Sequence, residues 1–202
     1  MIHYENFRSG NVEVGTDWTV QNGGFNILRA PSTWSNGAYV NWLEGNVVAT
    51  SGGAKRVSSH LPEASQDLSK SVEWKCNFKL NTINDEFFRF WPFANHEDVN
   101  YLTAGCTGYF LLLTWTAGLF RLYRSAGGGV ITAIIDTTWT PDALEHELIL
   151  TREVSGANRY WRAYLDKVLM GGPTNDATYT SGLYYGFNMD ELDRICEIKI
   201  SS

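Results

Sequence analysis

Apolar residues in this chain occur in short clusters, and almost every cluster is β-branched or aromatic and is bounded by Gly, Asn, Asp or Ser. The segment SVEWKCNFKLN alternates well: charged and amide residues occupy one face, and the other face carries Val72, Trp74, Cys76, Phe78 and Leu80. A period of two predicts a strand with one buried and one solvent-facing side. Helical patterns are nearly absent, and the glycines are spread evenly as turns. The sequence therefore predicts an all-β fold.

Later segments predict hairpins. YFLLLTWT (109–116) is uniformly apolar, as expected of a central strand covered on both faces. Strands are expected on either side of the glycines at 127–129, and again before and after a two-residue turn at Asp166 and Lys167. In the strand before that turn, Leu148 and Leu150 should face the core. The number and spacing of these strands favour one two-sheet sandwich over residues 1–202.

Charge and hydropathy exclude several classes of protein. The net charge is −6, and the chain has no basic cluster to neutralise phosphates, so we expect no nucleic-acid partner. It has no apolar run of roughly 18 residues, so we expect no membrane insertion. Because MIHYENFRSG lacks the pattern of a signal peptide, we expect synthesis in the cytoplasm, with export in a virion or by another route as an alternative. The three cysteines are too widely spaced for a disulfide framework or a zinc site.

The pattern of strands and turns also resembles a known superfamily. It is carried by FFRFWPFANHEDVNYL (87–102), GLFRLYR (118–124), RAYLDKVLMGG (162–172) and NDATYTSGLYYGF (175–187). These segments are similar to those of concanavalin A-like lectins and glucanases, in particular the laminin-G-like jelly rolls. The resemblance implies a two-sheet antiparallel jelly-roll sandwich in which the first strand pairs with the last. It also implies a glycan or protein partner, and in laminin-G-like domains calcium is often held at one rim.

Eight tryptophans are more than one core needs, so some of the rings are expected to lie at a binding surface. Exposed rings stack on the C–H faces of sugars while nearby polar groups bind the hydroxyls. The alternative is that the tryptophans in loops fold back and cover the ends of the sandwich. The candidate ligand-binding residues are Trp34, Trp91, Tyr101 and Trp139.

Two polar clusters suggest further sites. In NHEDVN, the side chains of Asn95, Asp98 and Asn100 predict either a calcium site, because Ca²⁺ takes six to eight oxygen ligands, or a polar turn that caps its own backbone. Glucanases of this fold use paired carboxylates on one strand face. The corresponding candidates, Glu145 with Glu147 and Glu191 with Asp193, depart from the superfamily pattern Glu-x-Asp-x-x-Glu: Cys196 takes the place of the final Glu after Glu191 and Asp193.

Three functions follow from these observations. The first is a non-catalytic module that binds glycans or a protein partner and uses no cofactor other than calcium. The second is a structural subunit of a particle, such as a bacteriophage decoration or tail component, which would form homo-oligomers or assemble into the virion. The third is a glycoside hydrolase or polysaccharide lyase. Fold alone does not decide among them.

Overall fold

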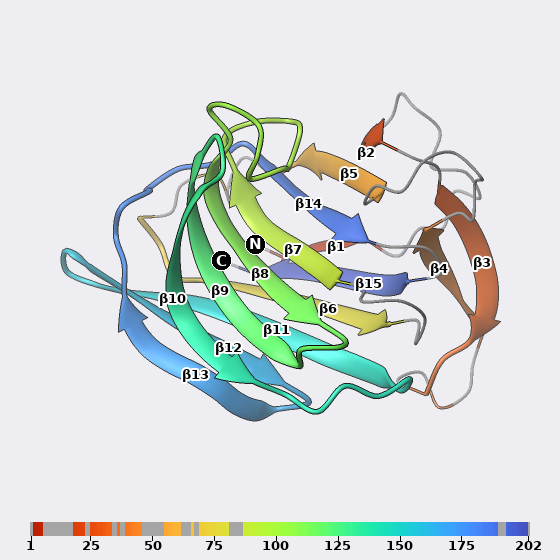
Figure 1. Ribbon diagram of the computed structural model, residues 1–202. Coiled ribbons are helices and arrows are strands. Elements are labelled where there is room, and N and C mark those ends of the chain that lie inside the picture. Colours follow the sequence, from red (N-terminus) through yellow and green to blue (C-terminus); the bar gives the residue numbers. More distant parts are fainter. Residues whose placement is uncertain are drawn as a thin grey trace.

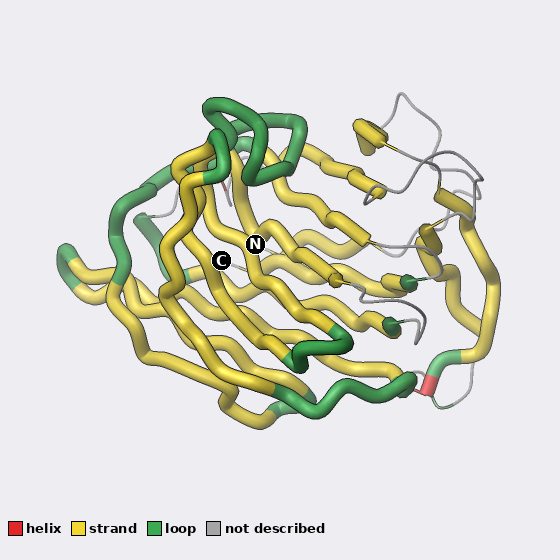
Figure 2. The backbone as a smooth tube through the Cα atoms, in the orientation of Figure 1, coloured by secondary structure: helices red, strands yellow, loops and turns green. Residues whose placement is uncertain are grey.

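A computed structural model describes residues 2–5, 18–22, 25–33, 36, 39–45, 55–61, 66, 69–80, 87–189 and 193–201. The described elements are strands arranged in two antiparallel sheets that pack face to face (Figure 1, Figure 2). This is the jelly-roll sandwich that the sequence predicts. Among the described residues there is no helix long and apolar enough to cross a membrane.

One sheet has eight strands, in the order β13-β12-β11-β6-β15-β4-β3, with β1 also paired to β15. Its bounds are β1 Ile2–Glu5, β3 Phe25–Pro31, β4 Tyr39–Gly45, β6 Val72–Lys79, β11 Glu145–Ser155, β12 Asn158–Leu165, β13 Val168–Asn175 and β15 Arg194–Ser201. The β1–β15 pair confirms the expected pairing of the first and last strands.

The other sheet has seven strands, in the order β10-β9-β8-β7-β14-β5-β2. Its bounds are β2 Trp18–Asn22, β5 Lys55–His60, β7 Phe87–Ala94, β8 Thr107–Thr114, β9 Leu119–Gly127, β10 Val130–Thr138 and β14 Tyr184–Met189. The apolar segment predicted to be a central strand is β8, which lies between β7 and β9.

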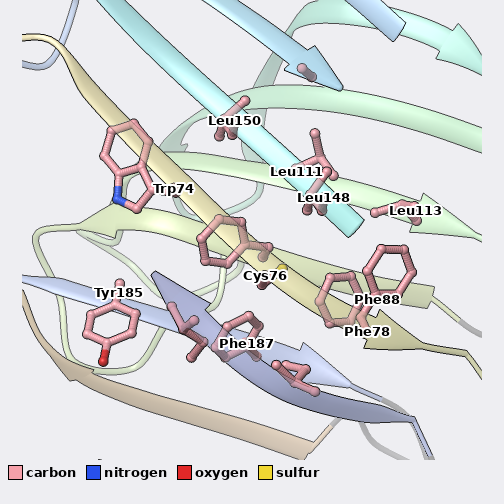
Figure 3. Close-up of a cluster of buried hydrophobic side chains, with 14 of the residues drawn as sticks. Trp74, Cys76, Phe78, Phe88, Leu111, Leu113, Leu148, Leu150, Tyr185 and Phe187 are labelled. Atoms are coloured by element: carbon pink, nitrogen blue, oxygen red, sulfur yellow. The ribbon is translucent and has the colours of Figure 1, made fainter. Parts of the chain in front are cut away.

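The core lies between the two sheets and is rich in aromatic rings (Figure 3). Phe78 of the eight-stranded sheet stacks on Phe88 of the other sheet, with ring centroids 5.0 Å apart. Trp161 similarly lies 4.5 Å from Tyr109 across the interface. Each fully buried side chain of this size contributes about 1.5–3 kcal/mol to folding, so such contacts dominate the cohesion of the sandwich.

The alternation predicted from the sequence is confirmed in the core. The apolar face of β6 is buried, including the side chain of Cys76. Leu148 and Leu150 on β11 also face the core. The turn between β12 and β13 has positive φ angles at both Asp166 (50°) and Lys167 (69°), the backbone of the type I′ turn that the pattern predicted.

Candidate ligand-binding face

The face of the seven-stranded sheet that points away from the core carries a row of mostly polar side chains. Each lies opposite the next in the strand register, so six adjacent strands contribute one residue each. With neighbouring strands about 4.8 Å apart, the row extends roughly 24 Å across the sheet. We call it the polar row, and in order from β5 to β10 it consists of Arg56, Asn188, Arg89, Leu112, Arg121 and Asp136.

A second row on the same face is aromatic and supports the first. Trp91 packs against Phe110 at 4.7 Å between ring centroids, and Phe110 stacks on Tyr123 at 5.2 Å. The indole N–H of Trp91 donates to the Oδ1 of Asn188 at 2.8 Å, which fixes one member of the polar row. The packing of these rings thus holds the neighbouring polar side chains in place.

The loop 95–106 folds over this aromatic row. Asp98 accepts a hydrogen bond from Arg56 at 2.9 Å and one from the hydroxyl of Thr103 at 2.7 Å. Tyr101 stacks on Phe110, with 5.7 Å between the ring centroids. The loop is therefore attached to the sheet by an ion pair and by ring packing, and Tyr101 comes to lie beside the polar row.

Gly186 provides the space for this loop. A Cβ at this position would lie 2.4 Å from the carbonyl oxygen of Val57 and 3.0 Å from a methyl group of Val99, in the loop. We expect Gly186→Ala to lower the free energy of unfolding by about 1–3 kcal/mol, the usual cost of overpacking. Urea denaturation checks this, and a stability within a few tenths of a kcal/mol of wild type would contradict the packing described.

The guanidinium groups of the polar row have distinct surroundings. The Cζ of Arg89 lies 3.7 Å from the ring centroid of Phe87 and 5.0 Å from that of Tyr101. Arg121 donates to Asp136 at 2.6 Å and to the hydroxyl of Tyr123 at 3.2 Å. These hydrogen bonds raise the pKa of Arg121, and the bond to Asp136 has the largest effect. The guanidinium therefore stays charged at all physiological pH values. The row thus presents fixed donors next to an exposed carboxylate and partly exposed rings.

The structure brings two of the four predicted ligand-binding residues to this face. Tyr101 is half-buried beside Arg89, whereas Trp91 is fully buried beneath the loop and offers no ring face at the surface. Trp139 folds back over an end of the sandwich: it is 8% exposed, its N–H donates to the carbonyl of Thr114, and its ring contacts that of His146. Trp34 lies outside the described residues. A ligand-binding role for the four stays a prediction.

In the loop predicted as either a calcium site or a polar turn, the side-chain oxygens of Asn95, Asp98 and Asn100 accept hydrogen bonds from other protein groups. Asn95 accepts from the backbone N–H of Thr107 at 2.8 Å, and Asn100 accepts from that of Leu102 at 3.2 Å. Asp98 binds Arg56, whose positive charge competes with a cation. Among the described residues, no three His, Cys, Asp or Glu side chains gather as metal ligands. A calcium site formed by Asn95, Asp98 and Asn100 stays a prediction, as does the alternative of a capped polar turn.

The candidate catalytic carboxylates are held in structural contacts. One carboxylate oxygen of Glu145 accepts hydrogen bonds from both the N–H and the hydroxyl of Thr33, and a third from Ser32. Glu147 is 2% exposed and forms an ion pair with Lys75. Asp193 is fully buried. Glu191 lies outside the described residues.

The arginines of the polar row are the residues that sequence reasoning missed. A signal for them was present, because Arg89 alternates with the buried Phe88 and Phe90 and must therefore point away from the core. Arg121 alternates with Phe120 and Leu122 in the same way. The sequence does not show that these strands lie side by side. That becomes known only from the order of the strands in the sheet.

Sequence comparison does not place the chain in a family: no family model and no curated protein matches it. Solved structures do match. The carbohydrate-binding module CBM66 from Bacillus subtilis aligns with a TM-score of 0.58 and 15% identity, over 92% of this chain and 96% of that chain. The carbohydrate recognition domain of Emp47p aligns with a TM-score of 0.54 and 12% identity, over 95% and 91%.

A third match comes from a virus. The CBM2 module of the evolved Dit of Lactobacillus casei BL23 phage J-1 aligns with a TM-score of 0.53 and 11% identity, over 98% of this chain and 93% of that chain. At such identities the likeness shows the fold alone. The chain therefore has the same two-sheet jelly-roll β-sandwich fold as these three domains.

Proposed function

We propose that the protein is a non-catalytic glycan-binding module and that it binds its ligand on the polar row beside Tyr101. The observation that carries the proposal is the combination on one sheet face of arginine donors, a carboxylate and half-exposed aromatic rings. A sugar presents both hydroxyl groups and apolar C–H faces. The charged side chains can bind the hydroxyl groups, and the aromatic rings can pack on the C–H faces.

The pair Arg121 and Asp136 suits a diol in particular. The guanidinium donates and the carboxylate accepts, and the Asp136 side chain is 56% exposed. One hydroxyl of a vicinal pair accepts from Arg121 while its neighbour donates to Asp136, and both bonds gain from the ionised partner. Tyr101 and Phe87, which flank Arg89, supply ring surface for the sugar.

Two features of the comparisons support this proposal and suggest its setting. Two of the solved structures that share the fold are named for binding or recognising carbohydrate, and another is a module of a phage Dit protein. We extend the proposal accordingly to a virion component, a decoration or tail part, that binds host glycans. We further propose that the fold is related to that of the laminin-G-like jelly rolls, on the strand and turn pattern described above.

The double variant Arg89→Ala, Tyr101→Ala is expected to weaken glycan binding roughly ten- to hundredfold, because it removes a charge-assisted hydrogen bond of about 1.5–3 kcal/mol together with a stacking ring. A glycan array identifies the ligand, and titration calorimetry with that glycan then measures the affinity of the variant.

The matched control is Arg162→Ala, Tyr160→Ala, which removes the same residue types from β12 in the other sheet. It should bind as wild type does. Equal loss in both variants, or unchanged binding in the first, would contradict the assignment of the face. An array without any binding at all would contradict the function itself.

A further inference from the structure

The two ends of the polar row differ in their chemistry. At the end formed by β9 and β10, Arg121 donates and Asp136 accepts, so a donor and an acceptor stand side by side. At the other end, the strand register places Arg56, Asn188 and Arg89 on the neighbouring strands β5, β14 and β7. These three side chains span two strand separations, roughly 10 Å. We call them the donor cluster.

Asn188 lies at the centre of the donor cluster, and its amide group has a fixed orientation. An indole N–H only donates, so the atom that lies 2.8 Å from Nε1 of Trp91 is the amide oxygen of Asn188. The amide nitrogen, Nδ2, therefore points away from Trp91, and the described residues provide no acceptor for it. Asn188 is 1% exposed, and a buried N–H group without an acceptor is unfavourable. A ligand that supplies the acceptor removes this cost.

Arginine donors stand on both sides of this amide. The Nε of Arg56 donates to Asp98 at 2.9 Å, and among the described residues this is the one hydrogen bond that the guanidinium makes. Its side chain is 22% exposed, so the terminal N–H groups can donate to a ligand. On the other side, the Cζ of Arg89 lies 3.7 Å from the ring centroid of Phe87. A guanidinium that stacks through its face donates in its own plane.

We infer that the donor cluster binds an acidic group of the glycan, either a carboxylate or a sulfate ester. The inference rests on the proposed function and names the class of glycan. A sugar hydroxyl both donates and accepts, whereas a carboxylate or a sulfate only accepts, which matches three donors in a row. The charges of the arginines strengthen these bonds. The carboxylate of Asp98, beside Arg56, already accepts from Arg56 and Thr103.

The two ends of the polar row together orient the glycan. The exposed carboxylate of Asp136 repels an acidic group, and with Arg121 it suits the hydroxyls of a neutral sugar unit. Arg89 and Arg121 are two strands apart, roughly 10 Å, so one oligosaccharide can reach both ends. The glycan is thus bound with an acidic unit over Asn188 and a neutral unit over Arg121.

A glycan array that carries each acidic glycan beside its neutralised form tests the class of glycan. One pair is a tetramer of galacturonic acid and its fully methyl-esterified form, and another is a sulfated galactan oligosaccharide and its desulfated form. In titration calorimetry, an acidic form should bind roughly ten- to hundredfold more tightly than its neutral counterpart. The pair that shows the preference distinguishes carboxylate from sulfate. The preference should shrink as salt is added, because salt screens the charges.

Asn188→Asp locates the acidic group on the protein. The new carboxylate still accepts from Trp91 but replaces Nδ2 with a negatively charged oxygen, so binding of the acidic form should weaken about tenfold or more. The control is Asn158→Asp in the other sheet, where Oδ1 also accepts a hydrogen bond, from Asn175 at 3.0 Å. It should bind as wild type does.

Arg56→Gln is a second variant, in which the charge is removed without burying a new one, and Arg162→Gln on β12 is its control. Circular dichroism checks that each variant is folded. Equal affinities of wild type for acidic and neutral forms would overturn the inference and leave the glycan site standing. Wild-type affinity for the acidic form in both Asn188→Asp and Arg56→Gln would overturn the donor cluster as its site. An array without any binding would contradict the proposed function and this inference with it.

Discussion

Replacing Trp161 with alanine is expected to lower the free energy of unfolding by about 4 kcal/mol, the usual range for a buried tryptophan. Trp161 is fully buried and packs at 5.9 Å on Trp74 of its own sheet and at 4.5 Å on Tyr109 of the other. The substitution also removes the ring that lies 5.5 Å from the guanidinium of Arg152, a cation that is desolvated by burial. A cavity at this point therefore breaks contacts within and between the sheets.

Urea denaturation followed by tryptophan fluorescence and by circular dichroism measures this effect. The control is Tyr160→Ala, which removes a ring from the other face of the same strand, where the residue is only partly buried. The control should unfold close to wild type. A Trp161→Ala protein as stable as that control would show that the two sheets do not meet through this ring.

Asp176→Ala is expected to lower the free energy of unfolding by about 3 kcal/mol, because it leaves the partners of this carboxylate without an acceptor. The carboxylate, 9% exposed, accepts from the hydroxyl of Tyr109 at 2.6 Å and from Arg124 at 2.6 Å. The carbonyl of the same residue accepts from the indole of Trp161 at 3.1 Å. Asp176 thus ties the segment after β13 to both sheets.

The same carboxylate makes stability depend on pH. Burial alone would raise the pKa of Asp176, but the hydrogen bonds from Tyr109 and Thr178 and the charge of Arg124 outweigh it and lower the pKa below 3.8. The stabilisation is therefore fully present above the ordinary carboxyl pKa and is lost as the pH falls through the lowered value.

Unfolding of wild type and Asp176→Asn at neutral pH and at acid pH checks this. The stability gap between the two should be largest near neutrality and should shrink in acid. A gap that stays constant, or widens, as the pH falls would contradict the assignment. Glu153→Ala, which removes the exposed partner of Arg162, should leave stability close to wild type at either pH.

Local patterns predicted those parts of the fold that depend on neighbouring residues. The alternation in β6 and the Asp166-Lys167 turn are examples, because a period of two and a tight turn are properties of the segment itself. The pairing of β1 with β15 joins opposite ends of the chain, and the sequence predicted it only through resemblance to a superfamily.

The candidate site depends on contacts that no local pattern contains. Asp98 and Arg56 are 42 residues apart in the chain, and their ion pair helps to place the loop that buries Trp91. The sequence NHEDVN predicts either a metal loop or a capped turn, and it contains no signal for the contact between Asp98 and Arg56. Likewise Trp139, in a proline-containing loop, turns inward because its N–H donates to the carbonyl of Thr114 and its ring packs against that of His146.

Mapping the bound glycan on the protein tests the central proposal most directly. With the glycan identified on the array, backbone and arginine side-chain NMR signals are followed during its titration. We predict shifts in β7, β8 and β9 around Arg89, Leu112 and Arg121, with the amides of the eight-stranded sheet unchanged. Shifts confined to the eight-stranded sheet, or to the loop around Trp139, would contradict the proposed binding face.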